Sequence, residues 1–152
     1  MQATTAFEAI RAFGEHEHRD IASGLALIHE AGGLSEPGAD ALARRSLREV
    51  LAWAARTLEP HMAWEETWLY PQIEFLTGTP WSTRAARVDH AQIAAVLAIL
   101  RLDEARGAHT VTAVATADLR RHLVTLEALL RSHIDREEQL LLPVLDAGEA
   151  QP

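Results

Sequence analysis

The sequence contains no cysteine, which excludes disulfide bonds, thiolate metal ligands, iron–sulfur clusters and cysteine nucleophiles. Any metal that this chain binds must therefore have nitrogen and oxygen ligands. No apolar run approaches the roughly 18 residues that a membrane-spanning helix requires. The N-terminal segment also lacks the basic and apolar regions of a signal peptide, so we expect a cytoplasmic protein with no membrane partner.

Positive charge is scarce as well, and no local cluster of basic residues offsets the deficit. The chain has 14 Lys and Arg against 22 Asp and Glu, which gives a formal net charge of -8 at pH 7. Such a surface repels phosphate backbones. We therefore expect no nucleic-acid partner.

Helical periodicity dominates the sequence. The 152 residues, 48% of them hydrophobic, are long enough for one domain with its own hydrophobic core. Apolar residues recur at helical spacing almost throughout, strand patterns are absent, and breaks containing Gly or Pro fall at three places. We therefore predict one all-α domain over residues 1–152, with four helices at 4–31, 40–76, 82–106 and 110–146.

Several residues mark where these helices should begin or bend. Three polar residues stand at expected N-caps: Asp40, Ser82 and Thr110. Proline lacks the backbone N–H, and its ring clashes with the preceding turn. We expect kinks inside the second helix or near helix ends at the following positions: Pro60, Pro71 and Pro143.

An internal repeat relates the two halves of the chain. Residues 17–28 align with residues 89–100, and residues 61–71 align with residues 133–143. Short connections between long helices make neighbouring helices antiparallel. The predicted architecture is therefore an up-down-up-down antiparallel four-helix bundle, built from two repeated helical hairpins.

The repeat places histidine and glutamate at ligand spacing. Each hairpin carries His-x-x-x-Glu on its second helix, as His61 with Glu65 and His133 with Glu137. Residues four apart lie on one face of a helix, about 6 Å apart along its axis. Apolar residues three or seven positions away predict that this face points inward: Leu58, Trp68, Leu126, Leu130 and Leu140.

Two further histidines belong to the same interior. His18 shares its face with Ile21 and Leu25, and His90 shares its face with Ile93 and Leu97. The midpoints between successive histidines fall in the predicted turns, so antiparallel packing brings all four histidines to roughly one level.

Six buried polar side chains at one level fit two metal ions. Two bridging glutamates supply four bonds, four histidines supply four, and one bridging oxygen supplies two. Each metal is then five-coordinate with one vacant position. This geometry suits iron or manganese better than a tetrahedral structural zinc.

These residues resemble the hemerythrin-like HHE cation-binding domains. The resemblance covers about residues 10–146 and rests on the repeated pattern E-H-x-x-I and H-x-x-x-E-E-x-x-x-x-P. It implies a hemerythrin-like four-helix bundle around a non-haem di-iron centre with two iron ions, manganese or zinc being less favoured. The metal ligands that it implies are His18, His61, Glu65, His90, His133 and Glu137.

The family resemblance leaves the role of the metal open. The expected function is to bind or react with dioxygen, peroxide or nitric oxide in sensing, stress defence or iron handling, with enzymatic turnover undecided. The alternative is a metal- or redox-responsive binding module that regulates a partner protein without turnover. A metal-free helical scaffold is a third, weaker interpretation.

This chain departs from oxygen-carrying hemerythrins at two places. Those proteins have His-x-x-x-His on the third helix, where this chain has Ala86 and Ala94 four residues on either side of His90. They also end with His-x-x-x-x-Asp, where this chain has His133 and Glu137. Both departures argue against reversible oxygen carriage and predict an exchangeable position on each metal.

The remaining polar residues have less specific interpretations. Glu66 and Glu138 are expected to be solvated or to hold a histidine N–H rather than to bind metal. His29 and His122 should face each other about 16 Å from the site, as a polar pair, a second metal site or a proton relay. We expect His16 to lie on the surface and Glu15 and Glu17 to be solvated. The aromatic residues are expected to pack in the core rather than to act in redox chemistry: Trp53, Trp64, Trp68, Tyr70 and Trp81.

Overall fold

Four long helical segments make up the part of the chain that the computed structural model describes, which is residues 6–34, 40–107 and 113–149. The first segment is helix α1 (Ala6–Leu34), and the third is α5 (Arg84–Gly107). The other two contain π-helical turns, labelled η. The second runs through α2 (Asp40–Trp53), η1 (Ala54–Leu58), α3 (Glu59–Trp64), η2 (Glu65–Leu69) and α4 (Tyr70–Thr77), and the fourth through α6 (Ala113–Arg136), η3 (Glu137–Leu141) and α7 (Leu142–Glu149).

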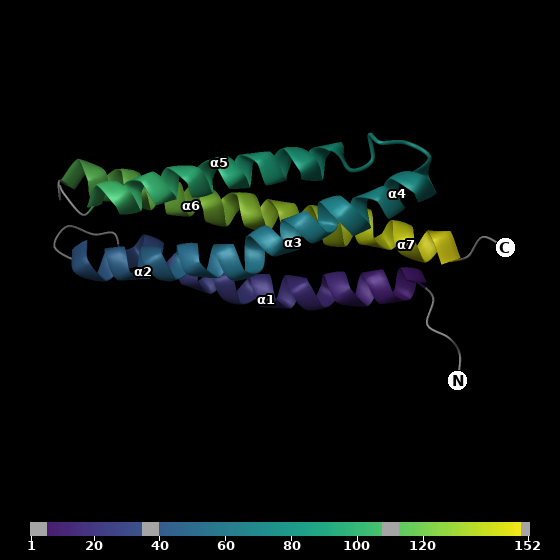
Figure 1. Cartoon of the computed structure of the whole chain (residues 1–152), viewed down its shortest axis with the longest axis horizontal. Helices are drawn as coiled ribbons and strands as arrows, with labels where there is room; N and C mark the ends of the chain where they lie inside the picture. The colour runs from purple at the N-terminus through teal and green to yellow at the C-terminus, as the bar shows by residue number, and fades with distance from the viewer. Residues whose placement is uncertain (1–5, 35–39, 108–112, 150–152) are drawn as a thin grey trace.

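The segments form the predicted up-down-up-down bundle. Helix α1 packs against α2 and α6, and α5 packs against α2 and α6, so the four segments form a closed square of neighbours (Figure 1). Helix α1 begins, and α7 ends, at the same end of the bundle (Figure 1). Within the described residues the structure is helical except for the turn after α4, and each segment boundary lies within three residues of its predicted position. The all-α prediction is confirmed.

The turn between the second and third segments differs from the prediction by one residue. Gly78 ends α4 in the left-handed conformation (φ 69°), which glycine adopts without steric strain. The first backbone bond of α5 runs from the N–H of Arg87 to the carbonyl of Thr83 (3.0 Å), so Thr83 is the N-cap rather than Ser82. The predicted caps at Asp40 and Thr110 concern side chains that lie outside the described residues.

Proline explains where the three π-helical turns occur. Each of these turns ends two residues before a proline: Pro60, Pro71 and Pro143. In each case the residue just before the proline donates its N–H to the carbonyl five residues earlier. The wider turn relieves the clash of the ring with the preceding turn, so the helix continues past the proline. The predicted bend at Pro60 is visible where α2 passes into α3 (Figure 1).

The π-helical turns also change which residues face the core. In an uninterrupted α-helix a seven-residue step returns to the same face, but a π turn contains one extra residue. The prediction that Trp68 and Leu140 face inward is therefore wrong, because their exposed fractions are 60% and 64%. The buried positions are Leu69 and Leu141, one residue later.

Two apolar clusters lie on either side of the level of the predicted ligands. The larger occupies the end of the bundle where α1 ends and α2 begins, and it includes Leu47, Leu97 and Leu126. The smaller occupies the opposite end and includes Tyr70 and Leu142. Buried polar side chains between two apolar layers are shielded from bulk water, which strengthens electrostatic interactions among them.

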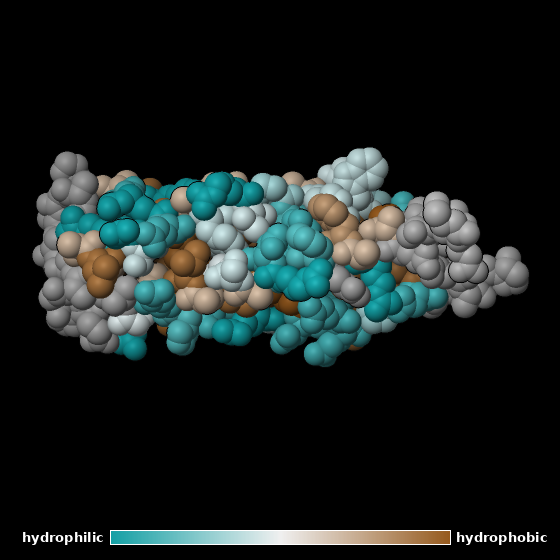
Figure 2. Space-filling view, turned by 90° about the horizontal axis from the view of Figure 1, so that it is seen from below, coloured by the Kyte–Doolittle hydropathy of each residue, from teal (hydrophilic) through white to brown (hydrophobic). Residues whose placement is uncertain are grey.

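The outer faces of the helices are mainly polar. Figure 2 shows one face of the bundle, on which hydrophilic residues predominate and apolar residues are scattered among them. Among the described residues, no helix combines the length and the apolar character that crossing a membrane requires.

Candidate metal centre

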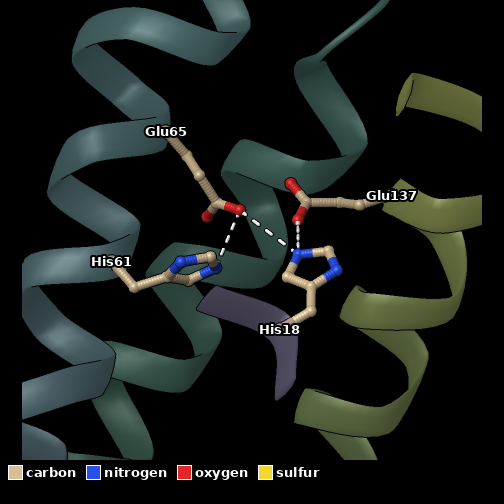
Figure 3. A group of neighbouring side chains, drawn as sticks. All are labelled: His18, His61, Glu65 and Glu137. Carbon is tan, nitrogen blue, oxygen red and sulfur yellow. Dashed lines mark hydrogen bonds and ion pairs between the residues drawn. The ribbon is translucent and has the colours of Figure 1, made fainter. Parts of the chain in front are cut away.

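The six predicted ligand residues converge in the bundle interior, and all six are buried. Their potential ligand atoms form two groups in which every atom lies within 4.8 Å of the others. The first donor group contains His18, His61, Glu65 and Glu137 (Figure 3). The second donor group contains Glu65, His90, His133 and Glu137. The two groups share both glutamates, as expected for two metal positions joined by carboxylates.

Glu65 presents one oxygen to each donor group. Its Oε1 lies 2.8 Å from Nε2 of His61, and its Oε2 lies 3.0 Å from Nε2 of His90. Glu137 is oriented differently, because its Oε2 lies 3.2 Å from Nε2 of His18 and 3.6 Å from Nε2 of His133. A single oxygen of Glu137 therefore faces both groups.

Several buried atoms in this cluster lack a hydrogen-bond partner. Both ring nitrogens of His61, Nδ1 of His133 and Oε1 of Glu65 are buried and unpartnered. Nε2 of His61 and Oε1 of Glu65 are close, but the angles do not form a hydrogen bond. Buried polar groups are nearly always paired, so buried nitrogen and oxygen atoms that lack a partner are candidates to bind a cation. The donor set therefore fits a bound metal.

The pKa directions show how strongly the cluster attracts positive charge. Burial lowers the pKa of His18, but the neighbouring carboxylates Glu137 and Glu65 outweigh it and raise the pKa to about 10. Burial raises the pKa of Glu65, but the four surrounding histidines hold it well below its ordinary range. Burial raises the pKa of Glu137, and the negative charge of Glu65 adds to this rise. The cluster thus favours positive charge, which a metal ion supplies.

Carboxylates support the outer nitrogen of each histidine. The Nδ1–H of His90 donates to Glu66 (2.9 Å), and that of His18 donates to Glu138 (3.3 Å). These bonds orient the rings so that Nε2 points into the cluster, and they make Nε2 a stronger donor. The prediction that Glu66 and Glu138 can hold a histidine N–H is confirmed.

The other two histidines face carboxylates at longer distances. Nδ1 of His133 lies 3.8 Å from Asp89, and Nδ1 of His61 lies 3.9 Å from Glu17. The expectation that Glu17 is solvated is therefore wrong, since its side chain is 23% exposed and faces a predicted ligand. Sequence reasoning missed Asp89, although the repeat aligns it with Glu17, and each residue directly precedes a predicted histidine ligand. The side chain of Glu15 lies outside the described residues.

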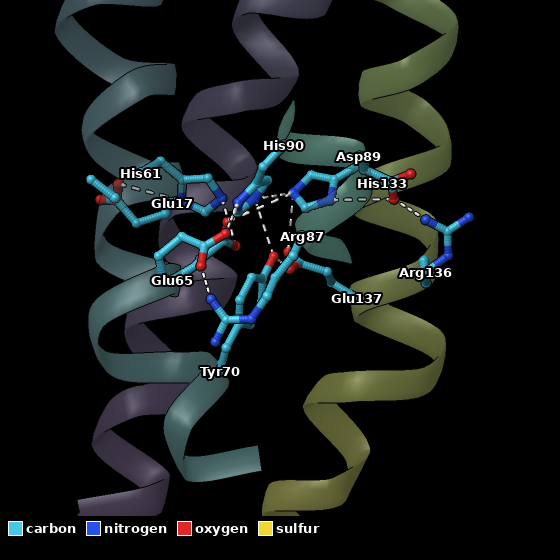
Figure 4. Close-up of polar contacts among 12 residues, drawn as sticks. Glu17, His61, Glu65, Tyr70, Arg87, Asp89, His90, His133, Arg136 and Glu137 are labelled. Atoms are coloured by element: carbon cyan, nitrogen blue, oxygen red, sulfur yellow. Dashed lines mark hydrogen bonds and ion pairs between the residues drawn. The ribbon is translucent and has the colours of Figure 1, made fainter. Parts of the chain in front are cut away.

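Two arginines fix the carboxylates behind the second donor group. Arg87 forms ion pairs with Glu66 and with Glu74, the latter at 3.0 Å. Arg136 forms an ion pair with Asp89 (Figure 4). Both arginines are about one-third exposed, so they connect the cluster to the surface of the bundle.

Tyr70 also contributes to the cluster, beyond the packing role that the sequence predicts. It is fully buried, and its hydroxyl donates to Oε1 of Glu137 (2.5 Å) and lies 3.1 Å from Nε2 of His90 (Figure 4). Its ring stacks on His90, with centroids 5.4 Å apart. Its place just before Pro71, at the end of η2, turns the side chain inward.

The tryptophans divide into two groups. Trp53 is buried, and Trp64 packs on Phe13 with ring centroids 4.6 Å apart, so the packing prediction holds for both. Trp68 and Trp81 are largely exposed instead. Neither exposed ring can contribute to the core.

The two alanines beside His90 also differ. Ala86 is buried, whereas Ala94 is exposed. Only Ala86 therefore stands where an additional imidazole on this helix could face the interior.

The remaining histidines lie outside the cluster. His16 is exposed and lies 3.7 Å from Asp20, as expected for a surface residue. His29 pairs with Glu127 (3.2 Å), and His122 pairs with Asp103 (2.6 Å). Among the described residues, neither His29 nor His122 belongs to a group that could hold a metal, so a second site at this end of the bundle has no support.

Comparison with protein families agrees with this geometry. The profile of the hemerythrin HHE cation-binding domain matches residues 10–145, which is most of the chain. The chain belongs to the hemerythrin HHE cation-binding domain family. Searches of curated proteins and of solved structures returned no match. The buried histidine and glutamate cluster of this hemerythrin HHE domain identifies it as a metal-binding domain.

Proposed function

We propose that this protein holds two iron ions as a non-haem di-iron centre. The ligands would be His18, His61, Glu65, His90, His133 and Glu137. The observation that carries this proposal is the pair of donor groups, each with two histidines, that share Glu65 and Glu137. A single ion would leave two of the four buried histidines without a metal.

The donor chemistry favours iron over zinc. Each position offers two imidazoles and two carboxylates, and the chain has no thiolate. Ions that accept five or six mixed nitrogen and oxygen ligands suit such positions better than an ion that prefers four in a closed tetrahedron. Bound iron would supply redox chemistry and open positions for small ligands.

The protein's own residues adapt the site to this role. The two apolar clusters exclude bulk water from the level of the ligands. The carboxylates on Nδ1 of His18 and His90 strengthen Nε2 of each ring as a donor. Ala86 is buried on the helix where oxygen-carrying relatives have a further histidine, and alanine has no ligand atom to offer. We infer that the centre binds or reacts with dioxygen, peroxide or nitric oxide, in sensing, stress defence or iron handling, rather than carrying oxygen reversibly.

Metal analysis of the purified protein tests the proposal. We expect two irons per chain and a visible absorption of ferric iron that Glu65→Gln abolishes. The matched control is Glu49→Gln, which changes an exposed glutamate on α2 that pairs with Arg45. At most one metal per chain, or zinc alone without visible absorption, would refute the di-iron proposal.

The alternative function is a metal- or redox-responsive module that regulates a partner protein without turnover, and one observation favours testing it. The donors come from all four helical segments, so metal occupancy or redox state would change the stability of the whole bundle, which a partner protein could recognise. Turnover of peroxide by the iron-loaded protein would favour an enzyme. Capture of a partner only by the loaded protein, without turnover, would favour the module.

A further inference from the structure

The internal repeat relates the six candidate ligands in pairs, but it does not repeat the tyrosine that contacts them. A shift of 72 residues (90 minus 18) relates His18 to His90 and Glu65 to Glu137, and it relates His61 to His133 in the same way. The same shift relates Tyr70 to Leu142. Both residues are buried, but only Tyr70 has a hydroxyl group. The six candidate ligands are thus related in pairs by the repeat, but the tyrosine hydroxyl at position 70 has no counterpart at position 142.

The orientations of the two shared glutamates differ accordingly. Glu65 divides its oxygens, with Oε1 toward His61 and Oε2 toward His90. Glu137 turns Oε2 toward His18 and His133, while Oε1 accepts the hydrogen bond of Tyr70. The equivalent position of the other hairpin holds Leu142, which has no hydroxyl with which to hold Glu65.

We propose that Tyr70 is a positioning residue that makes the two bridging carboxylates unequal. Its hydrogen bond retains Oε1 of Glu137, which leaves Oε2 as the oxygen of Glu137 that would hold a metal in both donor groups, whereas Glu65 would offer one oxygen to each group. This inference rests on the proposed di-iron centre. It deepens that proposal, because it states how each carboxylate would bridge.

Tyr70 is held firmly enough to act in this way. Its ring is fully buried and stacks on His90, and the guanidinium of Arg87 lies 5.2 Å from the ring centroid. Its backbone N–H donates to the carbonyl of Glu65, which fixes the residue at the end of η2.

The bridging mode determines how far apart the metals lie. A carboxylate that bridges through one oxygen draws two ions closer together than a carboxylate that spans them with two oxygens. Tyr70→Phe keeps the ring and removes the hydroxyl, which frees Oε1 of Glu137. The iron–iron distance should therefore lengthen in Tyr70→Phe, as measured by X-ray absorption on the anaerobic diferrous protein.

The control removes a hydroxyl that contacts neither donor group. The hydroxyl of Thr125 donates to the backbone carbonyl of Arg121 on α6. Thr125→Val should leave the iron–iron distance at the wild-type value. Thermal unfolding of the iron-loaded variants separates the bridging effect from a general loss of structure.

The outcomes distinguish this inference from the proposed function. Two irons in wild type and in Tyr70→Phe, with a longer iron–iron distance only in Tyr70→Phe, support it. Two irons in both with the same distance overturn the role of Tyr70 but leave the di-iron centre intact. Fewer than two irons in wild type overturn the proposed function and this inference together. A crystal structure of the iron-loaded protein with one oxygen of Glu137 on each iron would also overturn it.

Discussion

Loading with iron should raise the melting temperature of this protein substantially. Four buried atoms of the cluster have no hydrogen-bond partner: two on His61, one on Glu65 and one on His133. Each unsatisfied buried group costs about 1 to 3 kcal/mol, so the four together cost about 4 to 12 kcal/mol. That range approaches the whole stability of a typical domain, about 5 to 15 kcal/mol.

Metal binding removes this penalty in two ways. Iron would contact Nε2 of His61 and Oε1 of Glu65 directly. Metal on Nε2 also leaves the proton of each imidazole on Nδ1, where it faces Glu17 or Asp89. For a chain of this length, 1 kcal/mol shifts the melting temperature by about 2 to 4 °C. Even the lower estimate of the penalty therefore predicts a rise of at least about 8 °C.

The assay compares thermal unfolding of metal-free and iron-loaded protein at one pH under anaerobic conditions. The double variant His61→Leu/Glu65→Leu removes one histidine and one shared glutamate of the cluster. We expect iron to leave its melting temperature unchanged. A rise below about 8 °C in wild type, or a full rise in the double variant, would refute the reasoning.

Three further predictions address packing, pH and iron affinity. In Gly24→Ala the new Cβ would lie 1.9 Å from the ring of Trp53, so we expect a loss of about 1 to 3 kcal/mol in urea unfolding. Gly14→Ala meets only an ordinary contact at 3.6 Å and should stabilise by up to about 1 kcal/mol; equal effects of the two changes would contradict the packing. The pKa of His18 rises from 6.5 to about 10 on folding, so its stabilisation of the metal-free protein is complete below pH 6.5 and disappears as the pH rises through about 10. A urea midpoint that stays constant over this interval would disprove it. Glu66→Gln should weaken iron binding about 10- to 100-fold in a chelator competition, and unchanged affinity would show that this carboxylate does not support His90.

The sequence alone determined the helices and the residues of the candidate centre. Helical periodicity and breaks such as that at Gly78 are local signals, so the four segments were predicted to within three residues. The His-x-x-x-Glu spacing places both side chains on one face of a helix whatever surrounds it. The repeat then paired His61 and Glu65 with His133 and Glu137, and the structure brings these residues together with His18 and His90.

The sequence did not show which residues after Glu65 and Glu137 point into the core, and the structure was needed to identify them. A seven-residue step predicts that Trp68 and Leu140 are buried, and this prediction is wrong because a π turn intervenes. The prolines that follow these turns are visible in the sequence. Whether such a proline ends the helix, kinks it or is accommodated by a wider turn depends on how the continuing helix packs.

Only the tertiary structure decided which side chains support the ligands. Tyr70 carries no local pattern that separates it from a core aromatic residue. Glu17 and Asp89 share only their place before a predicted histidine ligand, which does not show where their side chains point. Their partners lie on other helices, at distances fixed by how far each helix is shifted along and rotated about its axis relative to its neighbours. Sequence spacing fixes directions within one helix, whereas the contacts between helices are decided by packing of the whole core.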